Sequence, residues 1–146
     1  MAGSAWGMTP RQSIEAECRR RGRPAVVAGC VALLERRKVD PELIVALGGP
    51  PARWALDPDG RGGPDYWLRV WAARGLLWTW DDAAQPAVLS ALDDEEWRVR
   101  ETAVRVLARH GVGVAVQPIA DLQADPSSRV RAAAGRALAR LTKERA

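Results

Sequence analysis

The chain has little of the chemistry on which most enzymes depend. Its one histidine is His110, and its two cysteines, Cys18 and Cys30, lie on separate predicted helices without a CxxC spacing. A single histidine with no cysteine near it in sequence supplies neither a zinc site nor a histidine-activated nucleophile. We therefore expect a structural histidine, a reduced and buried cysteine pair, and no metal site.

Long apolar runs are also missing. No stretch approaches the roughly 18 consecutive apolar residues that would indicate a membrane span. Residues 1–8 lack the basic start and long apolar segment of a secretory signal. The 146 residues suffice for one domain with its own core. The sequence predicts a cytoplasmic protein with a flexible tail over residues 1–8 and a single helical domain over residues 9–146.

Two patterns that resemble catalytic motifs have simpler explanations. Gly60, Gly62 and Gly63 are followed by Pro-Asp and not by Gly-Lys-Ser/Thr, so a phosphate-binding loop is unsupported. The acidic pairs 81–82, 93–94 and 95–96 all stand where helices are expected to begin, and there negative charge is favoured by the helix dipole and by capping. We assign no catalytic residue and expect no cofactor.

Lysine is scarce, because 20 of the 22 basic residues are arginine, and the formal net charge is +4. Arginine is suited to forked contacts with carboxylate and phosphate groups. A GC-rich genome also supplies arginine and alanine in quantity. The composition therefore permits an acidic partner without requiring one.

The chain does contain an internal repeat with a period of 31 residues. Nine residues between Asp94 and Arg109 recur 31 positions later, between Asp125 and Arg140, and residues 68–76 keep part of the same pattern. A fixed period of this size is the signature of a solenoid, in which each unit buries its apolar side against its neighbours. Solenoids present extended surfaces and bind more often than they catalyse.

Signals for the start and end of helices are frequent and signals for strands are nearly absent, so the sequence predicts an all-α fold. From residue 65 onward short and long helices alternate, which indicates stacked helical hairpins in regular repeats over 65–144. Residues 9–60 fit degenerate repeats or an N-terminal cap, and 57–64 form the one clear loop insertion. The expected helices cover residues 10–21, 24–38, 41–48, 65–80, 83–92, 95–110, 114–122 and 126–143, with a possible turn at 52–56.

The strings DDEEWRVRETAVRVLARHG and DPSSRVRAAAGRALARL resemble the short HEAT repeats of the phycobilisome-lyase type. The resemblance is strong over residues 82–142 and weaker over 65–80. It implies an armadillo-like α–α superhelix whose second helices line the concave side. It also implies a structural ladder between neighbouring repeats, made by the turn aspartates and the arginines of the Val-Arg motif. By position, the ladder residues are Asp94, Asp125, Arg69, Arg100 and Arg131.

Helical geometry predicts a stripe of arginines. At 100° per residue, Arg105 and Arg109 fall within about 20° of Arg98, one on either side, and the three lie roughly 120° from the centre of the core face. The equivalent positions are Arg129, Arg136 and Arg140 on the next helix and Trp67, Trp71, Arg74 and Trp78 on the previous one. Such a grid could grip phosphate or carboxylate groups and stack on planar groups. The alternatives are a solvated helix face for the arginines and core packing for the tryptophans.

We expect a non-catalytic interaction module, a scaffold or adaptor, that docks an acidic protein partner on this arginine-rich surface as a monomer or weak homodimer. The alternative is a nucleic-acid-binding protein, for which affinity would fall steeply with salt. A third interpretation is a DNA repair enzyme, because alkylpurine DNA glycosylases built from HEAT-like repeats have a similar basic, aromatic-lined concave face. No catalytic aspartate motif of that family matches this chain.

Overall fold

The computed structural model describes residues 7–50, 52–53 and 65–145, and every regular element within these ranges is helical. The all-α prediction is therefore confirmed. The predicted loop over 57–64 and most of the tail over 1–8 lie outside the described residues. No helix in the described part combines the length and the apolar character needed to span a bilayer. The chain divides into two compact units, Met1–Ala84 and Gln85–Ala146, and each is described by itself.

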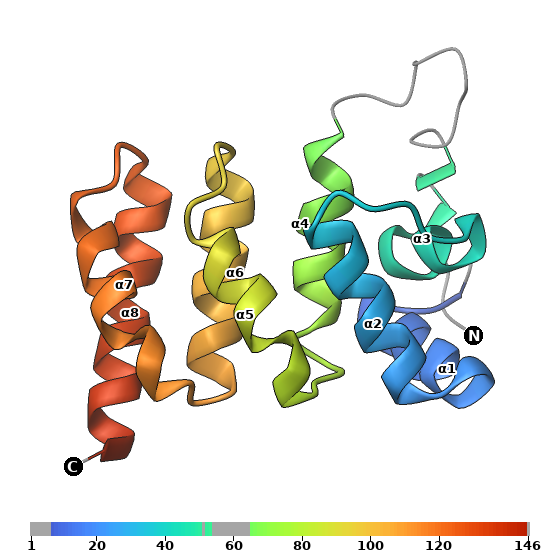
Figure 1. Cartoon of the computed structure of the whole chain (residues 1–146), viewed down its shortest axis with the longest axis horizontal. Helices are drawn as coiled ribbons and strands as arrows, with labels where there is room; N and C mark the ends of the chain where they lie inside the picture. The colour runs from blue at the N-terminus through green and yellow to red at the C-terminus, as the bar shows by residue number, and fades with distance from the viewer. Residues whose placement is uncertain (1–6, 51, 54–64, 146) are drawn as a thin grey trace. The chain divides into compact units, whose positions relative to one another are not determined.

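The first unit is a cluster of helices built around its last long helix. α4 packs against α2 and α3, and α1 packs against α2 and α3 (Figure 1). Ile14, Val26, Leu47 and Leu76 are fully buried between these helices and form the centre of the core. The elements are α1 (Pro10–Arg21), α2 (Arg23–Leu34), α3 (Pro41–Gly48), α4 (Tyr66–Gly75) and the 3-10 turn η2 (Asp82–Ala84).

The beginning of this unit follows its sequence signals. Thr9 caps α1 with a complete capping box, in which its side chain accepts from the Gln12 N–H and the Gln12 side chain accepts from the Thr9 N–H. Gly22 then joins α1 to α2 at a φ of +92°, in the left-handed region that favours glycine. Asp40 caps α3 by accepting from the Leu43 N–H at 3.0 Å. The predicted bounds of α1 and α3 are confirmed.

Two helices end earlier than predicted. α2 stops at Leu34 and not at residue 38, because Arg36 adopts a φ of +62° and its N–H bonds to the Leu33 carbonyl. α4 stops at Gly75 and not at residue 80, because the following N–H groups bond three residues back, as in the 3.0 Å bond from Leu77 N to the Arg74 carbonyl.

The second unit consists of two stacked helical hairpins, as the alternation of short and long helices predicts. The hairpins are α5–α6 and α7–α8, and their long helices α6 and α8 pack against each other (Figure 1). Its buried centre includes Val99, Leu107, Ile119, Val130 and Leu141. The elements are α5 (Gln85–Ala91), α6 (Trp97–Arg109), η3 (Gly113–Ala115), α7 (Val116–Asp121), η4 (Leu122–Ala124) and α8 (Ser128–Arg145).

Candidate interaction surfaces

The turns that precede α6 and α8 make the same hydrogen bonds 31 residues apart. In the first, a side-chain oxygen of Asp94 accepts from the Glu96 N–H at 2.9 Å, and the Asp94 carbonyl accepts from Arg100 Nη1 at 2.8 Å. The second turn repeats both bonds, at 2.9 and 2.7 Å, with Asp125, Ser127 and Arg131. The repeat in the sequence is therefore also a repeat of side-chain geometry, and both aspartates satisfy backbone N–H groups at a helix start.

One ion pair links the two hairpins of the second unit. Arg100 donates from Nε and Nη2 to the two carboxylate oxygens of Asp125, at 2.8 and 3.0 Å. The side chains are only 14% and 4% exposed. Burial by itself would raise the pKa of Asp125, but hydrogen bonds from Arg100 and from the Ser127 N–H outweigh it and hold the pKa below its ordinary value. This bidentate pair fixes the register of α8 against the preceding repeat.

The remaining ladder positions are described within their own units. In the first unit, Arg69 is 3% exposed and lies 3.9 Å from Asp65. Arg131, in the second unit, is exposed; its charge helps to lower the pKa of Asp125, but it makes no hydrogen bond or ion pair with a carboxylate among the described residues.

Six arginines of α6 and α8 form what we call the arginine face. Five of them have exposed side chains, and Arg98 is 37% exposed and pairs with Glu96 at 2.6 Å. Within the described part of the chain, neither Arg105 nor Arg136 has an ion-pair partner. The face consists of Arg98, Arg105, Arg109, Arg129, Arg136 and Arg140. Solvated guanidinium groups thus cover two helices that pack side by side.

A tryptophan joins the starts of the two stripes. The Cζ atom of Arg98 lies 4.4 Å from the Trp97 ring centroid, and that of Arg129 lies 5.8 Å from the same centroid. Both distances fall within the range of cation–π attraction. Because Arg98 belongs to α6 and Arg129 to α8, the indole holds the two arginine stripes together at this end. The sequence analysis did not place Trp97 in the grid.

The stripe residues predicted on a helix over 65–80 are less exposed than a binding stripe requires, and Trp78 lies beyond the end of α4. Trp67, Trp71 and Trp78 are all half-buried, and the rings of Trp67 and Trp71 stack 6.3 Å apart. The expectation that Arg74 lies on an exposed stripe is wrong, because its Nη2 donates to the Leu47 carbonyl at 2.7 Å and burial lowers its pKa. The Arg74 side chain stabilises the end of α3 inside the first unit.

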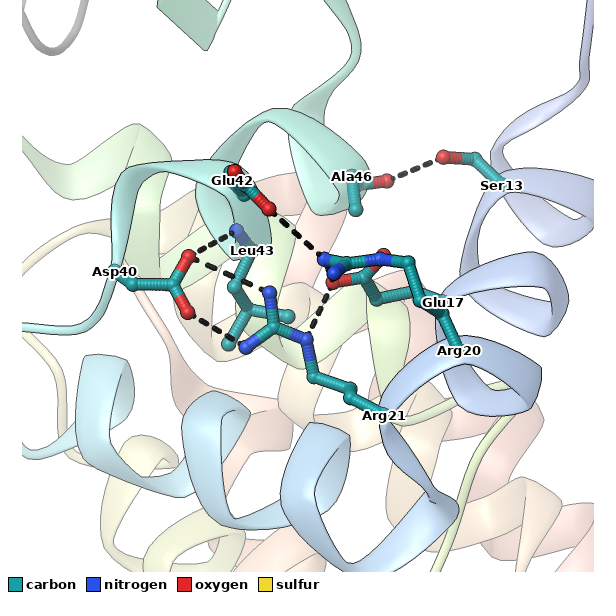
Figure 2. Close-up of polar contacts among 8 residues, drawn as sticks. All are labelled: Ser13, Glu17, Arg20, Arg21, Asp40, Glu42, Leu43 and Ala46. Atoms are coloured by element: carbon teal, nitrogen blue, oxygen red, sulfur yellow. Dashed lines mark hydrogen bonds and ion pairs between the residues drawn. The ribbon is translucent and has the colours of Figure 1, made fainter.

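A network of ion pairs in the first unit was missed from the sequence. Glu17 of α1 is 7% exposed and accepts from Arg20 at 2.7 Å and from Arg21, while Arg21 reaches Asp40 at 2.6 Å (Figure 2). The bond from Arg21 is the main reason that the pKa of Asp40 falls to about 2. Arg20 also pairs with Glu42 of α3 at 3.2 Å. The network clamps α1 to the start of α3.

A groove of about 680 Å³ lies beside this network, between α1 and α3. Ser13 bridges the two helices by donating to the Ala46 carbonyl at 2.7 Å (Figure 2). The groove is lined by apolar side chains together with two acidic and two basic side chains, so the charges of its lining cancel. The lining residues are Met8, Ser13, Ala16, Glu17, Arg20, Pro41, Glu42, Val45, Ala46, Gly49, Pro50 and Arg53.

Residues considered for chemistry have structural partners. Both cysteines are free thiols: Cys18 contacts the Thr79 hydroxyl at 3.4 Å, and burial raises the pKa of Cys30 to about 12. Asp81 accepts from the Ala83 N–H at 2.8 Å and so caps the turn before α5. His110 ends α6 and is half-buried. Clusters of three or more metal-ligating side chains are absent from the described residues.

Comparison with models of protein families gives a match. A family model described as HEAT repeats matches residues 61–145. The match covers more than half of the chain, including α4 and every helix of the second unit. No curated protein matches the sequence.

Proposed function

Because the chain belongs to the HEAT repeat family, we propose that it is an interaction module whose arginine face binds an acidic segment of a partner protein. Proteins of this family are solenoids that serve as scaffolds and are in general not enzymes. The proposal adds the surface and the chemistry of the partner.

The observation that carries the proposal is the pairing of two arginine stripes across a helix–helix contact. α6 and α8 each present three arginines along one side, and Trp97 lies beneath Arg98 and Arg129 where the stripes begin. No acidic side chain among the described residues forms an ion pair with Arg105 or Arg136. A carboxylate-bearing segment that crosses both helices would meet several guanidinium groups at once.

The energetics require such multiple contacts. A single exposed ion pair contributes roughly 0.2–1 kcal/mol, which is too little for specific binding. Several forked arginine–carboxylate contacts can add to useful affinity, and their charge raises the association rate and sets the salt dependence. The indole of Trp97 adds a planar surface on which a guanidinium or a partner side chain can stack.

Charge reversal with a matched control tests the proposal. The double variant Arg105→Glu/Arg136→Glu changes the arginine face, whereas Arg19→Glu/Arg23→Glu changes exposed arginines of the first unit. Each reversal removes two charges, so both variants go from +4 to 0. Partners captured by the wild type and identified by mass spectrometry are then tested by titration. We expect the first variant to lose an acidic partner and the second to keep it.

Two results would contradict the proposal. Equal loss of binding in both variants would mean that only net charge matters. Tight binding of labelled duplex DNA or RNA at about 0.15 M salt, with a steep loss as salt rises further, would favour the nucleic-acid alternative. Circular dichroism of each variant checks that the helices remain intact.

A further inference from the structure

The outer face of α8 repeats positions that α6 buries. Arg100, Val104 and Ala108 follow one another at intervals of four residues, so they share a face of α6. Arg100 reaches Asp125 of the next hairpin, which marks this face as the one directed toward α7–α8. Val104 is 0% and Ala108 6% exposed. This face of α6 is therefore covered.

The positions of α8 that are equivalent to Val104 and Ala108 are accessible to solvent. Gly135 and Ala139 correspond to Val104 and Ala108 by the 31-residue period, and Ala139 is exposed. A Cβ atom added at Gly135 would meet nothing within 4 Å. Ala132, on the same side of the helix, is also exposed. These positions are small and apolar.

Two hydrogen-bond donors of Arg131 on this face of α8 have no acceptor among the described residues. Its Nη1 donates to the Asp125 carbonyl at 2.7 Å, as Nη1 of Arg100 donates to Asp94, so the two side chains are held by the same bond. Arg100 uses its other donors, Nε and Nη2, for the carboxylate of the next turn. Nε and Nη2 of Arg131 have no acceptor in the described part of the chain.

We propose that this outer face of α8 docks a helical hairpin of a partner protein, whose turn presents an aspartate to Arg131. The face consists of Arg131, Ala132, Gly135 and Ala139. Its small side chains allow a partner helix to approach closely, and the two unused donors match a carboxylate in the geometry that Arg100 and Asp125 already display.

Charge favours a partner over a second copy of this chain. Two copies that paired through the same face would bring Arg131 toward a surface that holds no acidic residue. The carboxylate of Asp125 in a second copy already accepts from its own Arg100. Gly135 lies about 120° around the helix from Arg129 and about 100° from Arg136, whereas Ala132 lies about 40° from Arg136 and borders the arginine face.

The chain's own last hairpin is the most direct probe, since it carries the aspartate turn that the proposal requires. Isotope-labelled full chain is titrated with a synthetic peptide of residues 115–145 and followed by NMR. We expect shifts at the amides of Ala132, Gly135 and Ala139. Arg131→Gln should weaken binding about tenfold, the effect of losing a charged hydrogen bond. The matched control Arg105→Gln, on α6, should change it by less than about threefold.

A second measurement covers the case in which the isolated peptide does not fold. The extended chain is the full protein with a second copy of residues 115–145 fused after residue 145. The first residue of the copy, Ala115, then takes the place of Ala146, so the 31-residue offset is kept. We expect the unfolding midpoint in urea to rise, and Arg131→Gln to destabilise the extended chain more than the original one. Equal effects in both chains, or an unchanged midpoint, would overturn the proposal. So would a concentration-dependent dimer of the original chain that Gly135→Arg dissociates, because a second copy would then occupy the face.

Discussion

The Arg100–Asp125 pair offers the sharpest test of the repeat interface. We predict that Arg100→Gln and Asp125→Asn each destabilise the second unit by about 2–3 kcal/mol, at or just below the lower end of the roughly 3–5 kcal/mol that breaking a fully buried pair costs. The value is not larger because Arg100 keeps some contact with water and the Ser127 N–H still bonds to residue 125. Such a loss is a large fraction of the stability of a small domain.

The double variant separates the pair from its surroundings. If the two side chains act mainly on each other, Arg100→Gln/Asp125→Asn costs less than the sum of the single variants, with a coupling energy of about 1.5–3 kcal/mol. Hydrogen exchange of the amides of Val104 and Val130 is the suitable measurement, because it reports on α6 and α8 even when the two units unfold separately.

The dependence on pH follows from the lowered pKa of Asp125. A carboxyl group whose pKa is lower in the folded state contributes its stability fully above the unfolded pKa of about 3.9. That contribution disappears as the pH falls through the folded pKa. The difference in stability between the wild type and Asp125→Asn should therefore be constant from pH 7 to pH 5 and shrink below pH 4.

Arg131 provides the internal control, since it occupies the equivalent position without a hydrogen bond or ion pair to a carboxylate among the described residues, and acts on Asp125 only through its charge. We expect Arg131→Gln to cost less than about 1 kcal/mol in the unbound chain, the usual net contribution of a hydrogen bond. A coupling energy below about 0.5 kcal/mol, or equal effects of Arg100→Gln and Arg131→Gln, would refute the reasoning.

Three further predictions concern other parts of the chain. The carboxyl carbon of Asp40 should titrate in NMR with a midpoint of about 2, and Arg21→Gln should return it toward the ordinary value. Gly48→Ala should destabilise the protein by about 1–3 kcal/mol in thermal unfolding, because the added Cβ would lie 2.7 Å from the Trp71 ring. Gly135→Ala should stabilise it by about 0.5–1 kcal/mol in the same measurement, because the added Cβ meets nothing within 4 Å and alanine favours a helix over glycine. Cys30 should react with a thiol reagent only after unfolding, since burial raises its pKa to about 12.

The fold could be predicted largely from local signals. Caps such as Thr9 and Asp40 mark helix starts, and the 31-residue period identifies the two hairpins that stack. The predicted ends of α2 and α4 were wrong because the observed ends depend on backbone conformation. The positive φ of Arg36, a residue with good helix propensity, is not encoded in the apolar pattern.

The candidate surfaces were predictable where they depend on helical periodicity. The 100° rule placed Arg105 and Arg136 on the solvent side of α6 and α8, and both are exposed. The same rule failed for Arg74, because burial there is decided by α3, which lies elsewhere in the sequence. The pair of Arg21 with Asp40 was missed for the same reason, although Glu17, Arg20 and Arg21 have the spacing of helical ion pairs.

The 31-residue repeat allows Arg100 and Arg131 to be compared at equivalent positions of two neighbouring hairpins. Arg100 and Arg131 both follow Arg-Val and make the same bond to the turn carbonyl, yet only Arg100 is hydrogen-bonded to a carboxylate among the described residues. The difference between them therefore measures the missing neighbour and not a difference in the residues. α8 then carries two surfaces, with Arg136 on one and Gly135 on the other, about 100° apart around the helix. Because Ala132 lies about 40° from Arg136, the two surfaces meet along one edge of α8, and a partner on one restricts access to that edge of the other.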